Sequence, residues 1–367
     1  MKKEFDISPE QIEEISNKCK NFWEILEKTQ FKSLDEKQKA WREIGLAPTL
    51  YNTIYTENTA KLNYYIDNDK KSNISPVLII PSLINKNYTM DLIKDHSMIS
   101  HLVKNNIPVY IIDWGEPGIE HGDYTLDEMI DGTINRIVKR IFRHSGKKHI
   151  HILGQCIGGV ISTIYATKYS SQGFIKSMTN ITSPVDFSKG GKLTEWTNPK
   201  TFNLDKIVNS FKENGAISPQ FIHAGFPFLD LNMTFNKYRN LFNLVDNDEF
   251  VTLYRALDFW GNDNIPYPCE IFRKFNRDLY QENKLFKGEL VIGDQKLNLK
   301  DIKIPLFNIM AKHDHVFPKE AALNIPKTKN KADIDKIYEG GHVTILAGLP
   351  ARFELYKDIE NFIKNNE

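Results

Sequence analysis

The chain has little of several features that would restrict its chemistry. Three cysteines occur in 367 residues, Cys19, Cys156 and Cys269, and their spacing matches neither a disulfide framework nor a metal site. No apolar run approaches the length that crosses a membrane, and residues 1–20 are charged throughout, unlike a signal peptide. The net charge is only +1, so no strong field attracts nucleic acid or an anionic membrane. We therefore expect a protein of the reducing cytoplasm, without a transmembrane segment, that binds no nucleic acid.

What the sequence does contain is an alternation of strand-like and helix-like segments. Short apolar runs, such as PVLIIP at 76–81 and VYIIDW at 109–114, are typical of strands that are buried on both faces of a sheet. Helix-like segments separate these runs, and the one at 125–144 begins with a capping-box pattern formed by Thr125 and Glu128. This alternation predicts an α/β fold, in which helices flank a mostly parallel sheet.

The alternation is interrupted once, which indicates an inserted segment. Residues 71–183 and 301–367 carry the core pattern, whereas residues 184–300 are rich in aromatic and turn residues. We predict a polar, helical N-terminal segment over 1–70, a core in two parts, and a cap or lid over 184–300. The same patterns predict strands at 55–66, 149–153, 174–183, 304–310 and 334–338, helices at 95–104, 204–211, 237–244, 249–260 and 352–364, and docking of the N-terminal segment through Trp23 and Trp41.

One motif points to covalent chemistry. Residues 154–159, GQCIGG, follow the strand-like run 148–153 and precede the helix-like run 160–169. This is the setting of a nucleophile elbow, G-x-S-x-G in most α/β-hydrolases, with Cys156 in place of serine. The glycines allow a sharp turn, and the helix start lowers a thiol pKa and offers N–H groups to an oxyanion. A cysteine acyl-enzyme is a thioester, close in energy to a coenzyme A (CoA) thioester, so acyl groups can be exchanged as well as hydrolysed.

Partners for this nucleophile occur later in the chain, in the order that an α/β-hydrolase fold requires. Asp314 follows one predicted core strand and His342 follows the next, so both lie where α/β active sites form. Each residue alone has a simpler interpretation. Cys156 could be a buried thiol in a tight turn, Asp314 a residue that caps the next helix, and His342 a structural histidine. Together and in this order they predict an acid and a base for Cys156. His315 either hydrogen-bonds near the site or is an ordinary loop histidine.

Backbone N–H groups are the expected oxyanion donors. We expect one from Ile157, directly after the nucleophile, and a second from Leu83 in the loop 81–86. The histidines show no metal-ligand spacing, so neither a metal nor an organic cofactor is expected. Aromatic residues of the cap are expected to belong first to its core, and some of them to line an acyl tunnel: Phe221, Phe226, Phe228 and Trp260.

At these motifs the sequence resembles a known family, the polyhydroxyalkanoate (PHA) synthases, and in particular the short catalytic subunits of class III and class IV. The resemblance extends from about Tyr55 to the C-terminus, and residues Gln155 and Ile157 beside the cysteine depart from those of many relatives. The similar stretches are PVLIIPSLINKNYTMDL, VYIIDWGEPG, GQCIGG, TSPVDF, DHVFP and GGHVTILAG.

The resemblance implies polymerisation of short-chain (R)-3-hydroxyacyl-CoA into a polyester with release of CoA. It implies that Cys156 is acylated, that His342 is its base, and that Asp314 helps His342 to activate the incoming hydroxyl. It also implies a growing polyester chain, a second synthase subunit, a homodimer and attachment to a polyester granule. Two rivals remain open: a cysteine-dependent thioesterase or esterase on the same fold, and a granule-coat scaffold that has lost catalysis.

Overall fold

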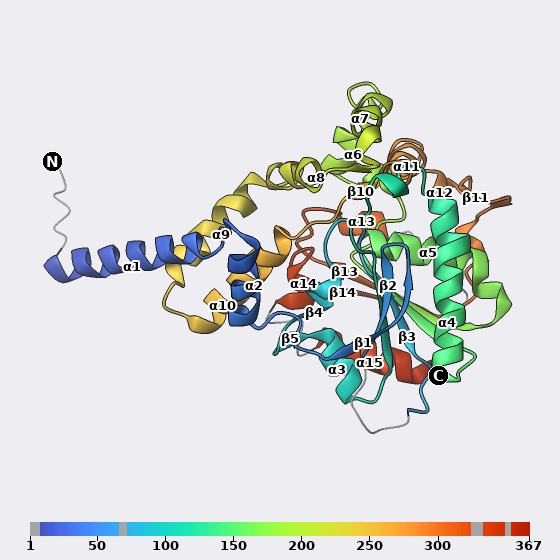
Figure 1. The fold of residues 1–367 in the computed structure, drawn as a ribbon, viewed down its shortest axis with the longest axis horizontal. Coiled ribbons are helices and arrows are strands. Elements are labelled where there is room, and N and C mark those ends of the chain that lie inside the picture. The colour runs from blue at the N-terminus through green and yellow to red at the C-terminus, as the bar shows by residue number, and fades with distance from the viewer. Residues whose placement is uncertain (1–7, 66–71, 324–332, 349–353) are drawn as a thin grey trace.

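A computed structural model describes residues 8–65, 72–323, 333–348 and 354–367, and its centre is one eight-stranded sheet (Figure 1). The strand order is β1-β2-β6-β3-β7-β8-β13-β14. The six strands β6, β3, β7, β8, β13 and β14 are parallel, whereas β2 runs antiparallel to both β6 and β1. The mostly parallel sheet confirms the expected α/β architecture. The strands are β1 Tyr51–Glu57, β2 Ala60–Tyr65, β3 Val77–Ile80, β6 Val109–Asp113, β7 Ile150–Gln155, β8 Ile175–Ile181, β13 Leu306–Ala311 and β14 Ile334–Tyr338.

Strand β3 is apolar throughout because helices cover both faces of the sheet. Leu78 and Ile80 of β3 belong to a core cluster on the side of α4 and α5, while Val77 and Ile79 belong to a cluster on the side of α3 and α15. Since side chains alternate between the faces of a strand, a four-residue apolar run supplies both cores. The covering helices are α3 Met98–Lys104, α4 Asn135–Ser145, α5 Ile157–Tyr169 and α15 Leu355–Asn365, and shorter helices α13 Lys319–Ala322 and α14 Thr344–Ala347 follow β13 and β14.

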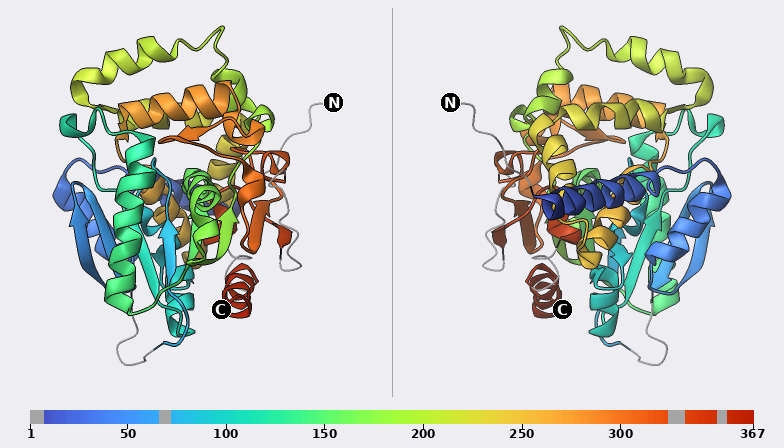
Figure 2. Two further views of the ribbon diagram at one scale, coloured as in Figure 1. Left: turned by 90° about the vertical axis from the view of Figure 1, so that its right-hand side faces the viewer. Right: turned by 90° about the vertical axis from the view of Figure 1, so that its left-hand side faces the viewer.

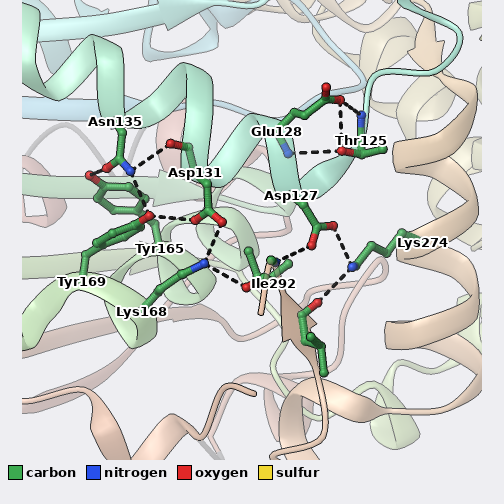
Figure 3. Close-up of polar contacts among 12 residues, drawn as sticks. Thr125, Asp127, Glu128, Asp131, Asn135, Tyr165, Lys168, Tyr169, Lys274 and Ile292 are labelled. Carbon is green, nitrogen blue, oxygen red and sulfur yellow. Dashed lines mark hydrogen bonds and ion pairs between the residues drawn. The ribbon is translucent and has the colours of Figure 1, made fainter. Parts of the chain in front are cut away.

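The expected capping box is confirmed at the start of the helix that precedes β7. Thr125 and Glu128 exchange hydrogen bonds between side chain and backbone in both directions (Figure 3). The helix then begins with a π-helical segment, Glu128–Ile134, before it continues as α4. Around that segment, Asp131 binds Lys168 of α5 and Asp127 binds Lys274 of α11 (Figure 3). The second ion pair joins the core to the part of the chain that follows β8, and Lys168 also reaches that part by donating to the carbonyl of Ile292.

The chain between β8 and β13 forms a helical layer above the sheet (Figure 2). Its segments far apart in sequence are joined by a short antiparallel pair, in which Tyr267 lies opposite Ile217. The division of the chain at residues 70, 183 and 300 stays a prediction. The elements of this layer are α6 Lys192–Trp196, α7 Leu204–Phe211, β9 Ala216–Ile217, α8 Pro219–Gly225, α9 Leu231–Asn243, α10 Asp248–Gly261, β10 Tyr267–Pro268, α11 Cys269–Lys274, the π-helical Phe275–Gln281, α12 Lys284–Lys287, β11 Val291–Ile292 and β12 Gln295–Lys296.

The N-terminal part contains the expected helices, and the single strand expected at 55–66 is instead a two-stranded hairpin. Helices α1 Pro9–Glu27 and α2 Leu34–Ile44 are followed by β1 and β2, which form a hairpin at the edge of the main sheet. Trp41 contacts Tyr88 and Phe259, in agreement with its expected docking role. The same expectation for Trp23 is wrong, since this side chain is 60% exposed. Helix α1 extends away from the body of the molecule (Figure 1).

Candidate active site

Cys156 lies at the turn between β7 and α5, in the strand–turn–helix setting that the sequence predicts. Its backbone has φ 53° and ψ −126°, a region that non-glycine residues rarely adopt. The backbone N–H of Cys156 donates to the carbonyl of Ile181 at 2.9 Å, which holds the turn against the end of β8. Strain of this kind persists only where the surrounding structure enforces it, and it is concentrated at functional sites.

The neighbouring glycines have a different task from the one inferred from the sequence. Cys156 itself takes the positive φ, while the glycines leave room for close packing. A Cβ atom on Gly158 would lie 2.1 Å from the backbone oxygen of Ile80, and one on Gly159 would lie 1.8 Å from Oγ of Ser183. Gly154 is similarly crowded, with Oγ of Ser162 at 2.4 Å. The helix start can therefore approach β3 and the loop after it, where the second oxyanion donor is expected.

Asp314 and His342 come together at the ends of β13 and β14. Nδ1 of His342 lies 2.8 Å from Oδ2 of Asp314, and their side chains are 6% and 3% exposed. Because a carboxylate only accepts, Nδ1 carries the proton in this contact. The other oxygen, Oδ1, accepts from the N–H groups of Val316 at 2.9 Å and Phe317 at 2.8 Å. The carboxylate is thus fixed at both oxygens, and Nε2 is the ring nitrogen that remains available for chemistry.

The charges around His342 favour an imidazolium. Burial disfavours that form, but the negative charges of Asp314 and Cys156, and hydrogen bonds to both, raise the pKa of His342 well above its usual range. His315 differs, because burial and the positive charge of His342 lower its pKa below the usual value. His342 is therefore suited to hold a proton taken from a thiol, and His315 is suited to remain neutral.

Cys156 opens into a cavity of about 450 Å³ between the sheet and the helical layer above it. His342 and His315 reach the same cavity, so the three side chains share one space. Most of the remaining wall is apolar, as expected of a site for an acyl chain. The core contributes Ser82, Ile84, Asn85, Gln155, Ile157, Val316, Phe317 and Val343, and the layer contributes Leu193, Trp196, Phe202, Phe221, Ile222, His223, Phe226, Leu229, Trp260, Tyr267, Phe272, Phe275, Asn276 and Tyr280, among others.

The two expected oxyanion donors lie in different settings. Ile157 is the first residue of α5, where backbone N–H groups have no acceptor within their own helix. Leu83 is 1% exposed, and its side chain lines a separate small cavity beside Trp114. Its neighbours Ser82 and Ile84 do reach the Cys156 cavity. The roles of Ile157, Leu83 and His315 stay predictions.

The aromatic residues of the cap divide into cavity-lining and exposed groups. Phe221, Phe226 and Trp260 line the Cys156 cavity. Phe228 and Phe221 are 61% and 43% exposed, so the expected place in a core is wrong for both. The sequence analysis missed Tyr267, which is buried, and Tyr280, which is partly buried; burial raises the pKa values of both, and the charge on Cys156 raises them further. Their position beside Cys156 depends on contacts between distant segments, and the motifs carry no signal for it.

The described residues provide neither a metal-binding cluster nor a membrane-spanning helix. No group of three or more His, Cys, Asp or Glu side chains that could hold a metal ion occurs in them. None of the helices in these residues is both long enough and apolar enough to cross a membrane. All three cysteines, Cys19, Cys156 and Cys269, are free.

Comparisons with known protein families match most of the chain. Residues 75–349 match the family described as alpha/beta hydrolase fold. Residues 17–102 match the family described as Poly-beta-hydroxybutyrate polymerase (PhaC) N-terminus. The second match covers α2 and the β1–β2 hairpin, for which the sequence motifs gave the least information.

Individual relatives agree with these family matches. The chain is 28% identical to the poly(3-hydroxyalkanoate) polymerase subunit PhaC of Haloferax mediterranei over 87% of its own length and 65% of that protein. It is 29% identical to the protein of the same name from Allochromatium vinosum, over 85% of its own length and 87% of that protein. Among solved structures, a monoglyceride lipase of Saccharomyces cerevisiae is similar in fold, with a TM-score of 0.55 at 12% identity, covering 88% of this chain and 96% of the lipase.

Proposed function

Because this chain belongs to the α/β-hydrolase fold family and, within it, to the poly(3-hydroxyalkanoate) polymerases, we propose that it polymerises short-chain (R)-3-hydroxyacyl-CoA by covalent catalysis at Cys156. The observation that carries the mechanism is the convergence of Cys156 with the Asp314–His342 pair in one apolar cavity. Substrate and product are an acyl-CoA and a growing polyester chain.

Acylation begins with transfer of the Cys156 proton to Nε2 of His342. The sulfur then attacks the thioester carbonyl, an oxyanion forms, and the bond to CoA breaks as the CoA sulfur leaves with the proton that His342 holds. The backbone N–H of Ile157 and that of Leu83 stabilise the oxyanion in this scheme. The raised pKa of His342 supports its role, since the imidazolium that forms is stabilised by Asp314.

Elongation depends more strongly on base catalysis than acylation does. The 3-hydroxyl of another acyl unit attacks the thioester on Cys156, its proton passes to His342, and an ester forms as the Cys156 sulfur is released. An alcohol is much harder to deprotonate than a thiol, so this step depends on the full Asp314–His342 pair. The fixed orientation of Asp314 by two backbone N–H groups supports this assignment.

The test is incubation of the purified chain with (R)-3-hydroxybutyryl-CoA, with CoA release and polymer turbidity followed together. We expect both signals from the wild-type chain, neither from Cys156→Ala, and wild-type rates from Cys19→Ala, which removes an exposed thiol outside the site. Release of CoA with free 3-hydroxybutyrate and no polymer would instead identify a thioesterase. Polymer formation by Cys156→Ala would refute covalent catalysis at this residue.

A second synthase subunit and a homodimer also belong to this proposal. Helix α1 carries Ile12, Ile15 and Trp23, which are 57%, 48% and 60% exposed, and we assign this apolar surface to the second subunit. The helical layer covers Cys156, so a partner that prefers the open form would expose the thiol. We expect co-expression with the subunit to raise both CoA release and the rate of Cys156 alkylation. Full activity of the isolated chain, with alkylation unchanged on addition of the subunit, would contradict this part.

The polyester itself is the proposed partner of the outer face of the layer. Phe226 and Leu229 line the cavity, while the adjacent Phe228 and Leu231 are 61% and 62% exposed. An apolar surface therefore continues from the cavity wall to the exterior, which suits a product chain that leaves the site and a granule that accumulates beside it. Replacement of Phe228 and Leu231 by serine should reduce the fraction of enzyme that sediments with polymer.

A further inference from the structure

Tyr267 carries a polar atom that the mechanism above does not use. The residue lies in β10, is 3% exposed, and lines the Cys156 cavity. Its hydroxyl has no hydrogen-bond partner among the residues that the structure describes. A buried hydroxyl without a partner loses its hydration and gains nothing in return, so such groups are rare unless a ligand completes them.

The ring of Tyr267 is held in a fixed orientation. It makes edge-to-face contacts with Phe272 and Phe275, with ring centroids 5.5 Å and 6.3 Å apart, and its backbone pairs with Ile217 of β9. Burial raises the pKa of its hydroxyl well above the usual value, and the nearby Tyr280 and Cys156 raise it further. The hydroxyl therefore stays protonated and acts as a hydrogen-bond donor in the cavity that Cys156 also lines.

A second unpartnered polar atom in the same cavity is Nδ1 of His315. The charges that act on His315 are those of His342, Asp314 and Asp230, whereas the charge of Cys156 acts on Tyr267. Tyr267 belongs to the core cluster against which Cys156 packs, and both residues line the same cavity, so its hydroxyl is the donor that we place where an acyl group attached to Cys156 begins.

A 3-hydroxyacyl group presents two oxygens near Cys156: the carbonyl oxygen and the oxygen on C3. Backbone N–H groups are assigned to the carbonyl, which leaves the C3 oxygen to find a partner in a wall that is mostly apolar. Resting on the function proposed above, we propose that the hydroxyl of Tyr267 donates a hydrogen bond to the C3 oxygen of the acyl group on Cys156. Tyr267 is then a specificity-determining residue that selects 3-oxygenated acyl groups over plain ones.

The test compares Tyr267→Phe with the wild-type chain on 3-hydroxybutyryl-CoA and butyryl-CoA, with single-turnover CoA release as the readout. One neutral hydrogen bond corresponds to about a 2- to 12-fold change, so kcat/KM for the 3-hydroxy substrate should fall by that factor while the butyryl value stays within about twofold. Tyr254→Phe is the matched control. Its hydroxyl is also buried without a partner in the described residues, but it belongs to the cluster of Ile25 and Leu241, outside the cavity.

Equal loss on both substrates, or an unchanged ratio, would overturn the assignment. If Tyr267→Phe does not fold, 3-methoxybutyryl-CoA provides the second measurement on the wild-type chain, because its C3 oxygen accepts but cannot donate. It should acylate Cys156 faster than butyryl-CoA, and equal rates would refute a donor at this position. Absence of CoA release from every substrate by the wild-type chain would instead refute the proposed function, and this assignment with it.

Discussion

Replacement of Asp314 by asparagine should separate acylation from elongation. Asparagine is nearly isosteric, and its Oδ1 can still accept from the N–H groups of Val316 and Phe317. The Oδ2 atom that lies 2.8 Å from Nδ1 of His342 becomes an amide nitrogen, which donates. Nδ1 must then accept, so the imidazole proton moves to Nε2 and blocks the nitrogen that should take protons from the substrate.

The size of the two losses follows from the acidity of the two nucleophiles. An ordinary cysteine thiol has a pKa of about 8.5, so about 3% is already ionised at pH 7 and loss of the base slows acylation by at most about 30-fold. An alcohol is not measurably ionised at this pH, and loss of a general base typically costs about 10²–10⁴-fold. Asp314→Asn should therefore accumulate short acyl adducts on Cys156.

Rapid quenching gives the rate of CoA release, and intact-protein mass spectrometry gives the length of the chain attached to Cys156. Glu339→Gln is the control, because this carboxylate is 60% exposed in the same loop as His342 and pairs with Lys312. It should leave both rates unchanged, and thermal unfolding should show that both variants are folded. Equal losses of acylation and elongation in Asp314→Asn would refute the division of labour.

Two further predictions concern stability. The pKa of His342 in the folded protein lies above its unfolded value of about 6.5, so its ion pair with Asp314 stabilises the fold fully below about pH 6.5 and less as the pH rises through the folded pKa. The difference in unfolding free energy between wild type and His342→Gln should therefore shrink between pH 6 and 9. A difference that grows over this range would contradict the charge assignment. Gly158→Ala should destabilise the fold by about 1–3 kcal/mol or more, because its Cβ would meet the backbone of Ile80, whereas Gly261→Ala meets nothing within 4 Å and should leave the melting temperature nearly unchanged in calorimetry.

The buried strands are the part of the fold that the sequence predicts best. The expected runs 76–81 and 109–114 correspond to β3 Val77–Ile80 and β6 Val109–Asp113. A central parallel strand is apolar on both faces, so it stands out as a continuous run. Strand β1 is largely exposed and lacks such a run, so the strand expected at 55–66 includes β2 but only the end of β1.

The site is predictable only where a motif marks it. Cys156, Asp314 and His342 stand in short patterns at strand ends, so their proximity could be expected from the order of the strands. Tyr267 stands between two prolines in a segment without periodicity, and its place beside Cys156 arises from pairing with β9 and packing on α11. The strained φ of Cys156 was also unexpected, because the surrounding glycines suggested that they would take the unusual conformation.

The strand order has a consequence for the chain while it is being made. Strand β8 pairs with β7 and with β13, but β13 is synthesised only after the whole helical layer. At 5–20 residues per second, the ribosome needs roughly 6–25 seconds to pass from Ile181 to Leu306. During that interval β8 is an open edge, which is the kind of surface that recruits other chains. Cys156 is already present, yet Asp314 and His342 are not, so a nascent or truncated chain carries a thiol without its base and would need protection from aggregation before it could begin turnover.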